Sequence, residues 1–337
     1  MMRRFLYGFM AVVLLGTGVM TGCGSQKEEA KATYRQMGIE YMEQGDYAGA
    51  IDAFNAALAQ GVGSVGADEL DITYYKATAQ YASGDVEGAM ATYNAVIDFN
   101  REAYEAYYLR GCLYGKQGDI EAAKADFANA VKYGGKDYAL YLNIYENLAG
   151  LGYVEDGATY LKEALAFKGE AVSDLEYKGQ IYYLLGEYEN AIGVLQNALE
   201  AGSTYANLYL AKCYDDMGDA ATAEDYLNTY MGTATADAIA LNELGELMLD
   251  KELYAEAVSY LEQGLACEVI PNRGALMHNL IVAYEFNGNF DKAWDLVQDY
   301  VILFPEDEEA QREYIFLKNR QMKVDNTEEP ETTENAE

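Results

Sequence analysis

The sequence predicts an all-α fold made of repeated helical hairpins, on the strength of three observations. A turn flanked on both sides by apolar residues at helical spacing recurs about every 34 residues along most of the 337-residue chain. Runs rich in Val, Ile and Thr that alternate as strands do are not evident. Only 3 prolines interrupt the chain, so long stretches can remain helical. We therefore expect one array of helix pairs rather than several compact domains.

Residues 104–137 show the repeated unit in its clearest form. The faces that would meet carry, at helical spacing, Tyr107, Gly111 and Tyr114 from the first helix and Ala123, Phe127 and Ala130 from the second. Gly118 can adopt the positive φ that ends a helix, and Asp119 can cap the next helix. The small residues at 111 and 123 would allow the two helices to approach closely.

The same unit recurs when the chain is aligned on the turn residue. The turn positions are Gly45, Gly84, Gly118, Gly152, Gly186, Gly218, Glu252 and Gly288. A small residue follows five positions later in each repeat: Ala50, Ala89, Ala123, Gly157, Ala191, Ala223, Ala257 and Ala293. Repeat seven lacks the turn glycine, and repeat four has Tyr145 where a small residue is usual. The step from Gly45 to Gly84 is longer than the others, which the sequence GVGSVGADEL at 61–70 explains as a flexible loop.

This period and pattern resemble the tetratricopeptide (TPR) repeat, and the resemblance covers about residues 31–305. It implies a right-handed α-α superhelix of about eight helix-turn-helix repeats with a C-terminal capping helix. We expect this solenoid with its capping helix over residues 32–323, where 306–323 would form the cap. Residues 324–337 are acidic and without periodicity, which predicts a disordered tail.

Residues 1–22 are typical of a targeting segment. Arg3 and Arg4 precede an apolar run that ends at Gly22-Cys23. Met20-Thr21-Gly22-Cys23 resembles the lipobox of bacterial lipoproteins, which implies an acylated Cys23 after removal of residues 1–22 and a polar tether over 23–31. The protein would then be anchored to the extracytoplasmic face of the cell membrane. An uncleaved membrane anchor is the alternative.

Composition excludes several function classes. The net charge of -33 argues against nucleic-acid binding, because the phosphate backbone would repel the protein. His278 is the single histidine, so triads and metal sites that need several histidines within one chain are ruled out. We predict no enzyme activity, no cofactor and no metal. Cys112, Cys213 and Cys267 are expected to be small apolar filler, with a bridge between the last two left open.

The TPR resemblance directs certain first-helix positions to a concave groove, in which the family binds extended peptides or partner helices. Carried onto this chain, the groove positions are Tyr74, Tyr81, Tyr108, Glu146, Glu176, Gln180, Tyr183, Tyr205, Leu208, Lys212, Leu249 and Phe286, with Arg35, Cys112, Glu246, His278 and Glu285 beside them. Aromatic side chains there would offer an amphipathic binding surface. The Lys/Asn clamp by which chaperone-binding members hold a terminal carboxylate is not visible.

Two functions from different classes follow. The first is a membrane-anchored scaffold for protein or peptide partners, which the family resemblance associates with cell-envelope assembly. The second is a lipoprotein that binds a glycan or another small ligand on its tyrosines. Sugar binding would need rings beside clustered Asp, Asn and Glu in one pocket, whereas a protein partner would contact many repeats. A cell-wall enzyme has the weakest support, because no acid/base pair can be located.

Overall fold

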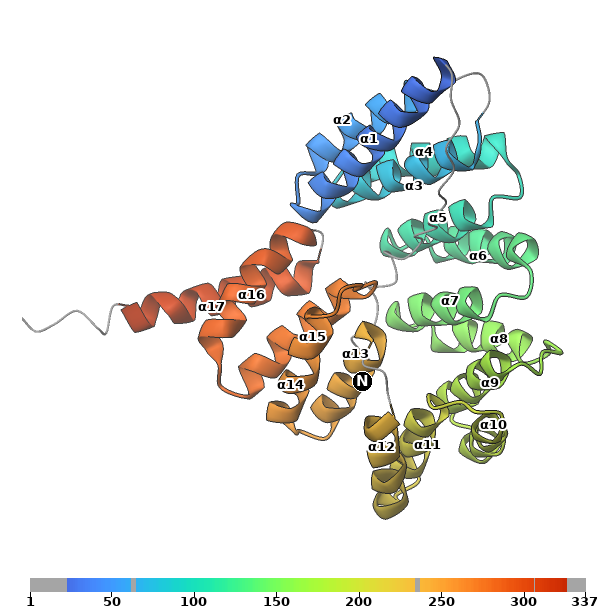
Figure 1. The fold of residues 1–337 in the computed structure, drawn as a ribbon, viewed down its shortest axis with the longest axis vertical. Helices are drawn as coiled ribbons and strands as arrows, with labels where there is room; N and C mark the ends of the chain where they lie inside the picture. The colour runs from blue at the N-terminus through green and yellow to red at the C-terminus, as the bar shows by residue number, and fades with distance from the viewer. Residues whose placement is uncertain (1–22, 62–64, 234–236, 306, 326–337) are drawn as a thin grey trace, which may run out of the picture. The chain divides into compact units, whose positions relative to one another are not determined.

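The computed structural model describes residues 23–61, 65–233, 237–305 and 307–325, and within these ranges it contains helices and no strands (Figure 1). The residues 1–22, which include the predicted targeting segment, and the residues 326–337 of the predicted tail lie outside the described part of the chain. An all-α fold of helical hairpins is therefore confirmed.

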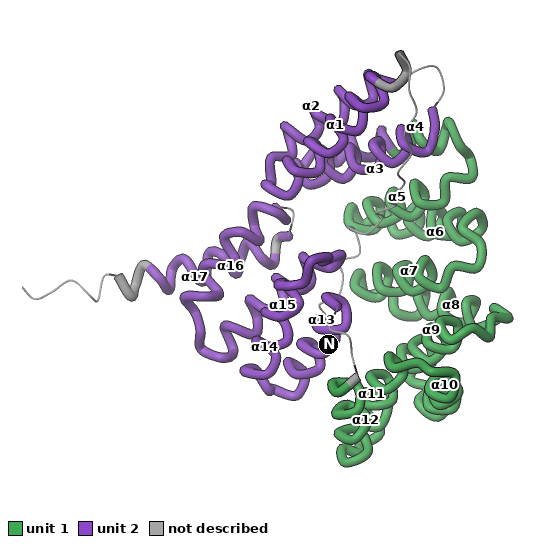
Figure 2. Tube along the Cα trace, in the orientation of Figure 1, with its two compact units in different colours: residues 1–8, 93–236 green, residues 9–92, 237–337 purple. Residues whose placement is uncertain are grey.

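The chain divides into two compact units (Figure 2). Unit 1 holds residues 93–236 and thus the end of α4 (Val86–Phe99), followed by α5 (Tyr104–Lys116), α6 (Ile120–Gly134), α7 (Tyr138–Gly150), α8 (Val154–Ala164), α9 (Val172–Leu184), α10 (Tyr188–Glu200), α11 (Ala206–Asp216) and α12 (Ala220–Thr233). Unit 2 holds the described residues up to 92 and from 237 onward. Its helices are α1 (Cys23–Glu43), α2 (Tyr47–Leu58), α3 (Ala67–Ala82), the start of α4, α13 (Ala238–Asp250), α14 (Tyr254–Leu265), α15 (Arg273–Phe286), α16 (Phe290–Leu303) and α17 (Glu308–Asp325).

Each predicted turn residue has the backbone conformation that the repeat requires. Positive φ angles occur at the glycines 45, 84, 118, 152, 186, 218 and 288, and Glu252 has φ 59°, the only positive value at a non-glycine residue in the described chain. At the turn of repeat three, the side chain of Asp119 accepts a hydrogen bond from the backbone N–H of Ala122 at 3.1 Å. The turn and cap together end one helix and start the next within a short connection.

The two helices of a hairpin approach closely at one glycine. A Cβ added to Gly111 would lie 2.8 Å from Phe127 and 3.2 Å from the backbone oxygen of Ala123. Glycines at 38, 179 and 245 meet one large residue of the second helix in the same way: Phe54, Leu195 and Leu261. These large partners are fully buried, so the glycine makes room for the apolar side chain that fills each hairpin.

Repeat four reverses this arrangement. Tyr145 occupies the place of the glycine on the first helix, and Gly157 occupies the place of the alanine on the second. A Cβ on Gly157 would lie 3.0 Å from the Tyr145 ring and 3.1 Å from the Tyr145 backbone oxygen. The space that glycine leaves on the first helix at 38, 111, 179 and 245 is therefore provided by the second helix here.

The ends of the array differ from the expected boundaries. Residues 24–31, predicted as a tether, form the first turns of α1, and Lys31 is buried. Part of the predicted loop 61–70 is also helical, because α3 begins at Ala67. The capping helix α17 is present and continues to Asp325, slightly beyond the predicted end.

Candidate binding surface

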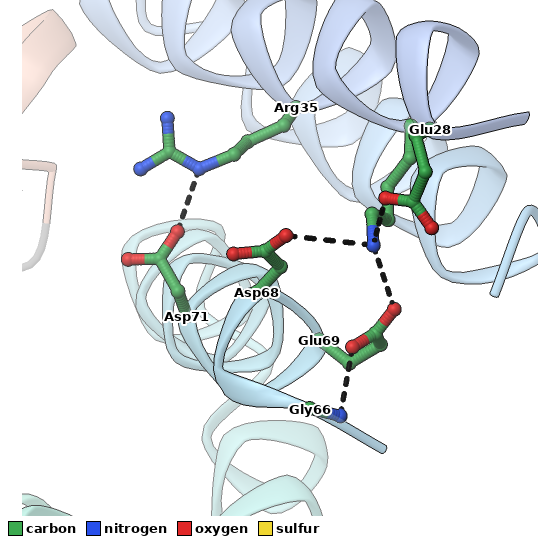
Figure 3. A network of polar contacts seen from close by, with 7 residues as sticks. Glu28, Arg35, Gly66, Asp68, Glu69 and Asp71 are labelled. Atoms are coloured by element: carbon green, nitrogen blue, oxygen red, sulfur yellow. Dashed lines mark hydrogen bonds and ion pairs between the residues drawn. The ribbon is translucent and has the colours of Figure 1, made fainter. Parts of the chain in front are cut away.

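The first helices of neighbouring repeats are joined by polar contacts in unit 2. Lys31 of α1 lies 2.7 Å from Glu28 on its own helix, 2.9 Å from Glu69 and 3.6 Å from Asp68 on α3 (Figure 3). Burial alone would lower the pKa of Lys31, but the hydrogen bonds to Glu28 and Glu69 outweigh burial and raise it. The hydrogen bond from Lys31, together with one from the Gly66 backbone N–H, lowers the pKa of Glu69.

A second ion pair lies one helical turn further along α1. The Nε of Arg35 donates to Asp71 Oδ2 at 2.6 Å (Figure 3), and the guanidinium lies 5.0 Å from the ring centroid of Tyr75. Arg35 is therefore held between a carboxylate and an aromatic face. These contacts hold α1 against α3. They also pair the positive charge of Arg35, which was predicted to lie beside the groove, with a carboxylate of this chain.

Unit 2 contains a further polar cluster between α13 and α15. The Nδ2 of Asn279 donates to Asn242 Oδ1 at 2.9 Å and to Glu246 Oε1 at 3.2 Å, and Asn242 Nδ2 donates to Glu246 at 3.1 Å. Asn242 is buried, so these hydrogen bonds offset the cost of placing an amide inside the protein. Glu246 was among the predicted groove positions, whereas the two asparagines were missed.

Unit 1 carries a cluster of three tyrosines, here called the tyrosine cluster: Tyr183 of α9, Tyr209 of α11, and Tyr205, which directly precedes α11. The Tyr209 ring lies 5.6 Å from that of Tyr183 and 5.4 Å from that of Tyr205, at interplanar angles of 75° and 56°. Tyr209 is buried, while the other two are half-buried. The Nζ of Lys212 lies 4.9 Å from the Tyr209 ring centroid, within cation–π range.

The start of α11 is fixed to α9 beside this cluster. The hydroxyl of Ser203 donates to Glu176 Oε1 at 2.5 Å and accepts from the backbone N–H of Ala206 at 2.9 Å. Ser203 thereby binds the backbone N–H of the first residue of α11 and joins this helix to α9. The tyrosine cluster is therefore mounted on two helices whose relative position is constrained.

The remaining predicted groove residues lie in several environments. Half-buried positions on first helices are occupied by Tyr74, Tyr81, Tyr108, Glu146, Gln180 and Leu249. The ring of Tyr108 lies 6.0 Å from Phe127, and burial raises the pKa of its hydroxyl well above the usual value. Leu208 and Lys212, in contrast, are buried.

Phe286 lies at the end of α15 and stacks on Tyr254, the first residue of α14, at 5.1 Å and 15°. Its side chain is 63% exposed. Tyr254 belongs to the second helix of the preceding hairpin. Phe286 therefore contacts that hairpin from the end of α15, next to the turn that follows it. The structure thus brings Tyr183 and Tyr205 together through Tyr209, and it leaves Phe286 outside that group.

The cysteines and the histidine show packing roles. Cys112 and Cys213 carry free, buried thiols, and burial raises the pKa of each to about 12, so both stay protonated at neutral pH. His278 lies 6.0 Å from the ring of Tyr300. Within the described residues, no group of His, Cys, Asp and Glu is placed to hold a metal ion. None of the helices that the structure describes is long and apolar enough to cross a bilayer.

Family models identify the repeat. Two models, both described as tetratricopeptide repeat, match residues 35–105 and 104–133. Residues 35–133 of this chain therefore consist of tetratricopeptide repeats. A TPR repeat-containing protein of Methanocaldococcus jannaschii is 30% identical to the chain over 131 residues, which are 35% of this chain and 23% of that protein. The match therefore spans about a quarter of the relative's length.

Solved structures with similar folds have low sequence identity to this chain. A TPR protein from Parabacteroides merdae is 14% identical with a TM-score of 0.46, covering 76% of this chain and 99% of its own. PilF of Pseudomonas aeruginosa is 16% identical with a TM-score of 0.40, covering 60% and 90%. YrrB, described as a TPR protein with an unusual peptide-binding site, is 17% identical with a TM-score of 0.33, covering 65% and 96%.

TPR repeats form scaffolds for protein interactions, and the side chains of this TPR protein suit binding. Its first helices present half-buried tyrosines, carboxylates and amides on a backbone held by ion pairs and caps. Such groups give contact area and hydrogen bonds to a partner.

Proposed function

We propose that this TPR protein is a lipid-anchored scaffold on the extracytoplasmic face of the cell membrane, where it binds a protein or peptide partner in cell-envelope assembly. The observation that carries the binding proposal is the tyrosine cluster. Tyr183 and Tyr205 are half-buried. Both pack on Tyr209, and Tyr183 also contacts Tyr188 while Tyr205 also contacts Tyr230. Their rings are therefore held rigidly, and the exposed part of each suits an aromatic contact with a partner.

A protein partner fits this cluster better than a sugar does. The rings of Tyr183 and Tyr205 are turned edge-on or tilted toward Tyr209 and do not form a flat platform. Glu176, a carboxylate of α9, is already engaged by Ser203. The cluster therefore supplies apolar contact area and hydroxyl groups, which is typical of protein interfaces.

The anchoring proposal rests on the sequence at the N-terminus. Met20-Thr21-Gly22-Cys23 follows two arginines and an apolar run, the order that a lipoprotein signal requires. The envelope location follows from this signal, and so does the class of partner, which would be another envelope protein.

The binding test begins with photo-crosslinking in membranes from a probe at Gln180, beside Tyr183 on α9, followed by identification of the captured protein. Affinity for that purified partner is then measured for Tyr183→Ala and Tyr205→Ala. Each is expected to weaken binding by roughly 1–3 kcal/mol if it is a hot spot. Tyr153, which is 40% exposed in the same unit, provides the matched control, and Tyr153→Ala should bind normally. Normal binding by both cluster variants would contradict the proposal.

The anchoring test is independent of the partner. Cys23→Ser should abolish incorporation of a labelled fatty acid and leave an unprocessed or released protein. Membrane retention and processing that match those of the unaltered protein would sink the lipoprotein assignment.

A further inference from the structure

The C-terminal helix α17 repeats the register of the first helices but lacks a second helix. Ala310 and Leu317 of α17 stand one repeat period after Leu276 and Ala283 of α15, and all four are buried, with exposures of 4% or less. The face that packs against the preceding hairpin is therefore the same in both helices. In α15 the opposite face is covered by α16.

One pair of identical residues shows what is missing on α17. Ile281 of α15 is 3% exposed, whereas Ile315, at the equivalent place one period later on α17, is 56% exposed. The neighbouring Phe316 is 52% exposed. Within the described residues no helix follows α17, so the place that a second helix takes in other repeats is open there, with Ile315 and Phe316 at its centre.

The rest of the chain offers no suitable cover on the C-terminal side. Residues 326–337, NTEEPETTENAE, contain a proline and a single alanine among polar and acidic residues. Such a segment has no apolar stripe with which to cover Ile315 and Phe316. A helix supplied by another molecule would complete the pair.

The charges of α17 indicate that this molecule is a second copy. The part of α17 up to Tyr314 holds three acidic and one basic residue, and the part from Ile315 onward holds three basic and one acidic. When the same helix is placed antiparallel, its basic half faces the acidic half of the first copy. Antiparallel is also the direction that the two helices of a hairpin have.

The net charge of the whole protein also favours α17 as the surface through which two copies meet. The chain carries a net charge of -33, so most faces of two copies would repel each other. The sequence of α17 holds equal numbers of acidic and basic residues, four of each. This helix thus combines exposed apolar side chains with local neutrality.

We propose that two copies of the protein associate through their α17 helices, packed antiparallel, so that each copy supplies the second helix that the other lacks. Ile315 and Phe316 of both copies form the centre of the contact. Arg312 and Asn319, which are exposed on the same face, lie next to the two-fold axis. The proposal concerns a surface separate from the tyrosine cluster and does not depend on the proposed function.

The test is photo-crosslinking of the full chain, because a contact made by a single helix pair is small and transient. Two differently tagged copies are co-expressed, and a photoreactive amino acid replaces Asn319. The expected product has twice the mass of 37.2 kDa and carries both tags. The same probe at Glu121, whose side chain is 90% exposed on α6, should give none. Absence of the product from position 319, or a product with residues 1–22, residues 326–337 or another protein, would overturn the proposal.

Two sets of variants identify the surface and its direction. The double variant Ile315→Asp, Phe316→Asp should lose the product, while Phe99→Asp, which alters a 60% exposed apolar residue on α4, should keep it. Glu313→Lys should reduce the yield about tenfold, because it places like charges together in both halves of the symmetric contact. Adding Lys318→Glu should restore the yield. With both charges reversed, position 313 of one copy again lies opposite an unlike charge at position 318 of the other. An unchanged yield in the Asp variant, or no recovery in the double reversal, would contradict antiparallel self-pairing.

Discussion

At the scale of single residues, Glu252 shows how strongly the repeat fixes its backbone. Seven turns of the array place glycine at positive φ, and repeat seven places Glu252 there at φ 59°. A side chain in this region costs roughly 1–2 kcal/mol relative to the right-handed conformation. The hairpin around it therefore stores strain that the other turns avoid.

Replacing Glu252 with glycine should stabilise the protein. The removed strain exceeds the extra chain entropy that glycine brings to the unfolded state, which leaves a gain of roughly 0.5–1 kcal/mol. The gain in the free energy of unfolding is measured by denaturant unfolding, together with hydrogen exchange in α13 and α14. Gly218 provides the reverse control: its φ is 85° and a Cβ there would meet no atom within 4 Å, so Gly218→Ala should destabilise through backbone strain alone. A destabilised Glu252→Gly variant would refute this explanation.

Gly157 is a second residue whose role depends on its partner. Alanine, which most repeats have at this position, should cost roughly 1–3 kcal/mol here, because its methyl group would press on the ring and backbone of Tyr145. Thermal unfolding is the measurement.

The controls for this prediction separate packing from helix propensity. Gly193 lies inside α10 with no atom within 4 Å of an added Cβ, so Gly193→Ala should stabilise by roughly 0.5–1 kcal/mol. Combining Gly157→Ala with Tyr145→Ala should recover part of the loss. If Gly157→Ala stabilises the protein as Gly193→Ala does, the close approach of Gly157 to Tyr145 is contradicted.

At the scale of elements, the contact between α1 and α3 depends on ionised carboxylates. The pKa of Glu69 is lowered from its ordinary value of about 4.5, chiefly by the hydrogen bond from Lys31. A lowered pKa in the folded state means that the stabilisation is complete above the unfolded value. It is lost as the pH falls through the folded value.

We therefore expect α1 to loosen from α3 below about pH 4.5, before acid unfolds unit 1. Hydrogen exchange of α1, corrected for intrinsic rates, measures this between pH 6 and pH 3. Glu69→Gln should cost roughly 1–3 kcal/mol at neutral pH and remove most of the pH dependence. Glu121→Gln, an exposed carboxylate on α6, should change neither. Equal acid sensitivity of α1 in Glu69→Gln would contradict the role of this pair.

The helices were largely predictable because their positions follow from the spacing of the repeat. Glu252 was placed at a turn by spacing alone, and its backbone conformation agrees. Residues 24–31 were expected to be a tether because they are polar, but Lys-Glu-Glu-Ala-Lys is a run of strong helix formers. Besides Glu28 on its own helix, Lys31 pairs with Glu69, which belongs to the next repeat, and no local pattern points to that second pair.

At the scale of the whole molecule, charge should limit stability. A net charge of -33 means that compact folding brings many carboxylates together. Raising the salt concentration from about 0.01 M to 0.15 M shortens the Debye length from about 30 Å to 8 Å. This screening weakens repulsion over the whole surface, while the partly buried pairs of Lys31 and Arg35 are screened less.

The thermal midpoint should therefore rise by roughly 1–2 °C over this salt range, equivalent to about 1 kcal/mol for a protein of this size. Scanning calorimetry at fixed pH provides the measurement. A control series with an uncharged osmolyte of equal osmolarity separates screening from general stabilisation. A midpoint that falls with salt would show that attractive ion pairs outweigh repulsion.

The binding surface was less predictable than the fold. Register gives the direction of a side chain from its own helix. Tyr183 lies on α9, whereas Tyr205 directly precedes α11. Register does not give what lies opposite, so Leu208 and Lys212 were expected in an open groove and are buried. Tyr209 was missed because its role as the packed centre of a cluster depends on neighbours that the spacing of the repeat does not give.

Tyr145 and Gly157 also constrain how this chain could have changed over evolutionary time. Arrays of this kind can lengthen, shorten or reshuffle by exchange between repeats. An exchange whose breakpoint falls between these two codons would join Tyr145 to a second helix with alanine, which is overfilled, or join Gly157 to a first helix with glycine, which leaves a void. The two residues must therefore be inherited together, and repeat four can be duplicated or replaced only as a whole hairpin.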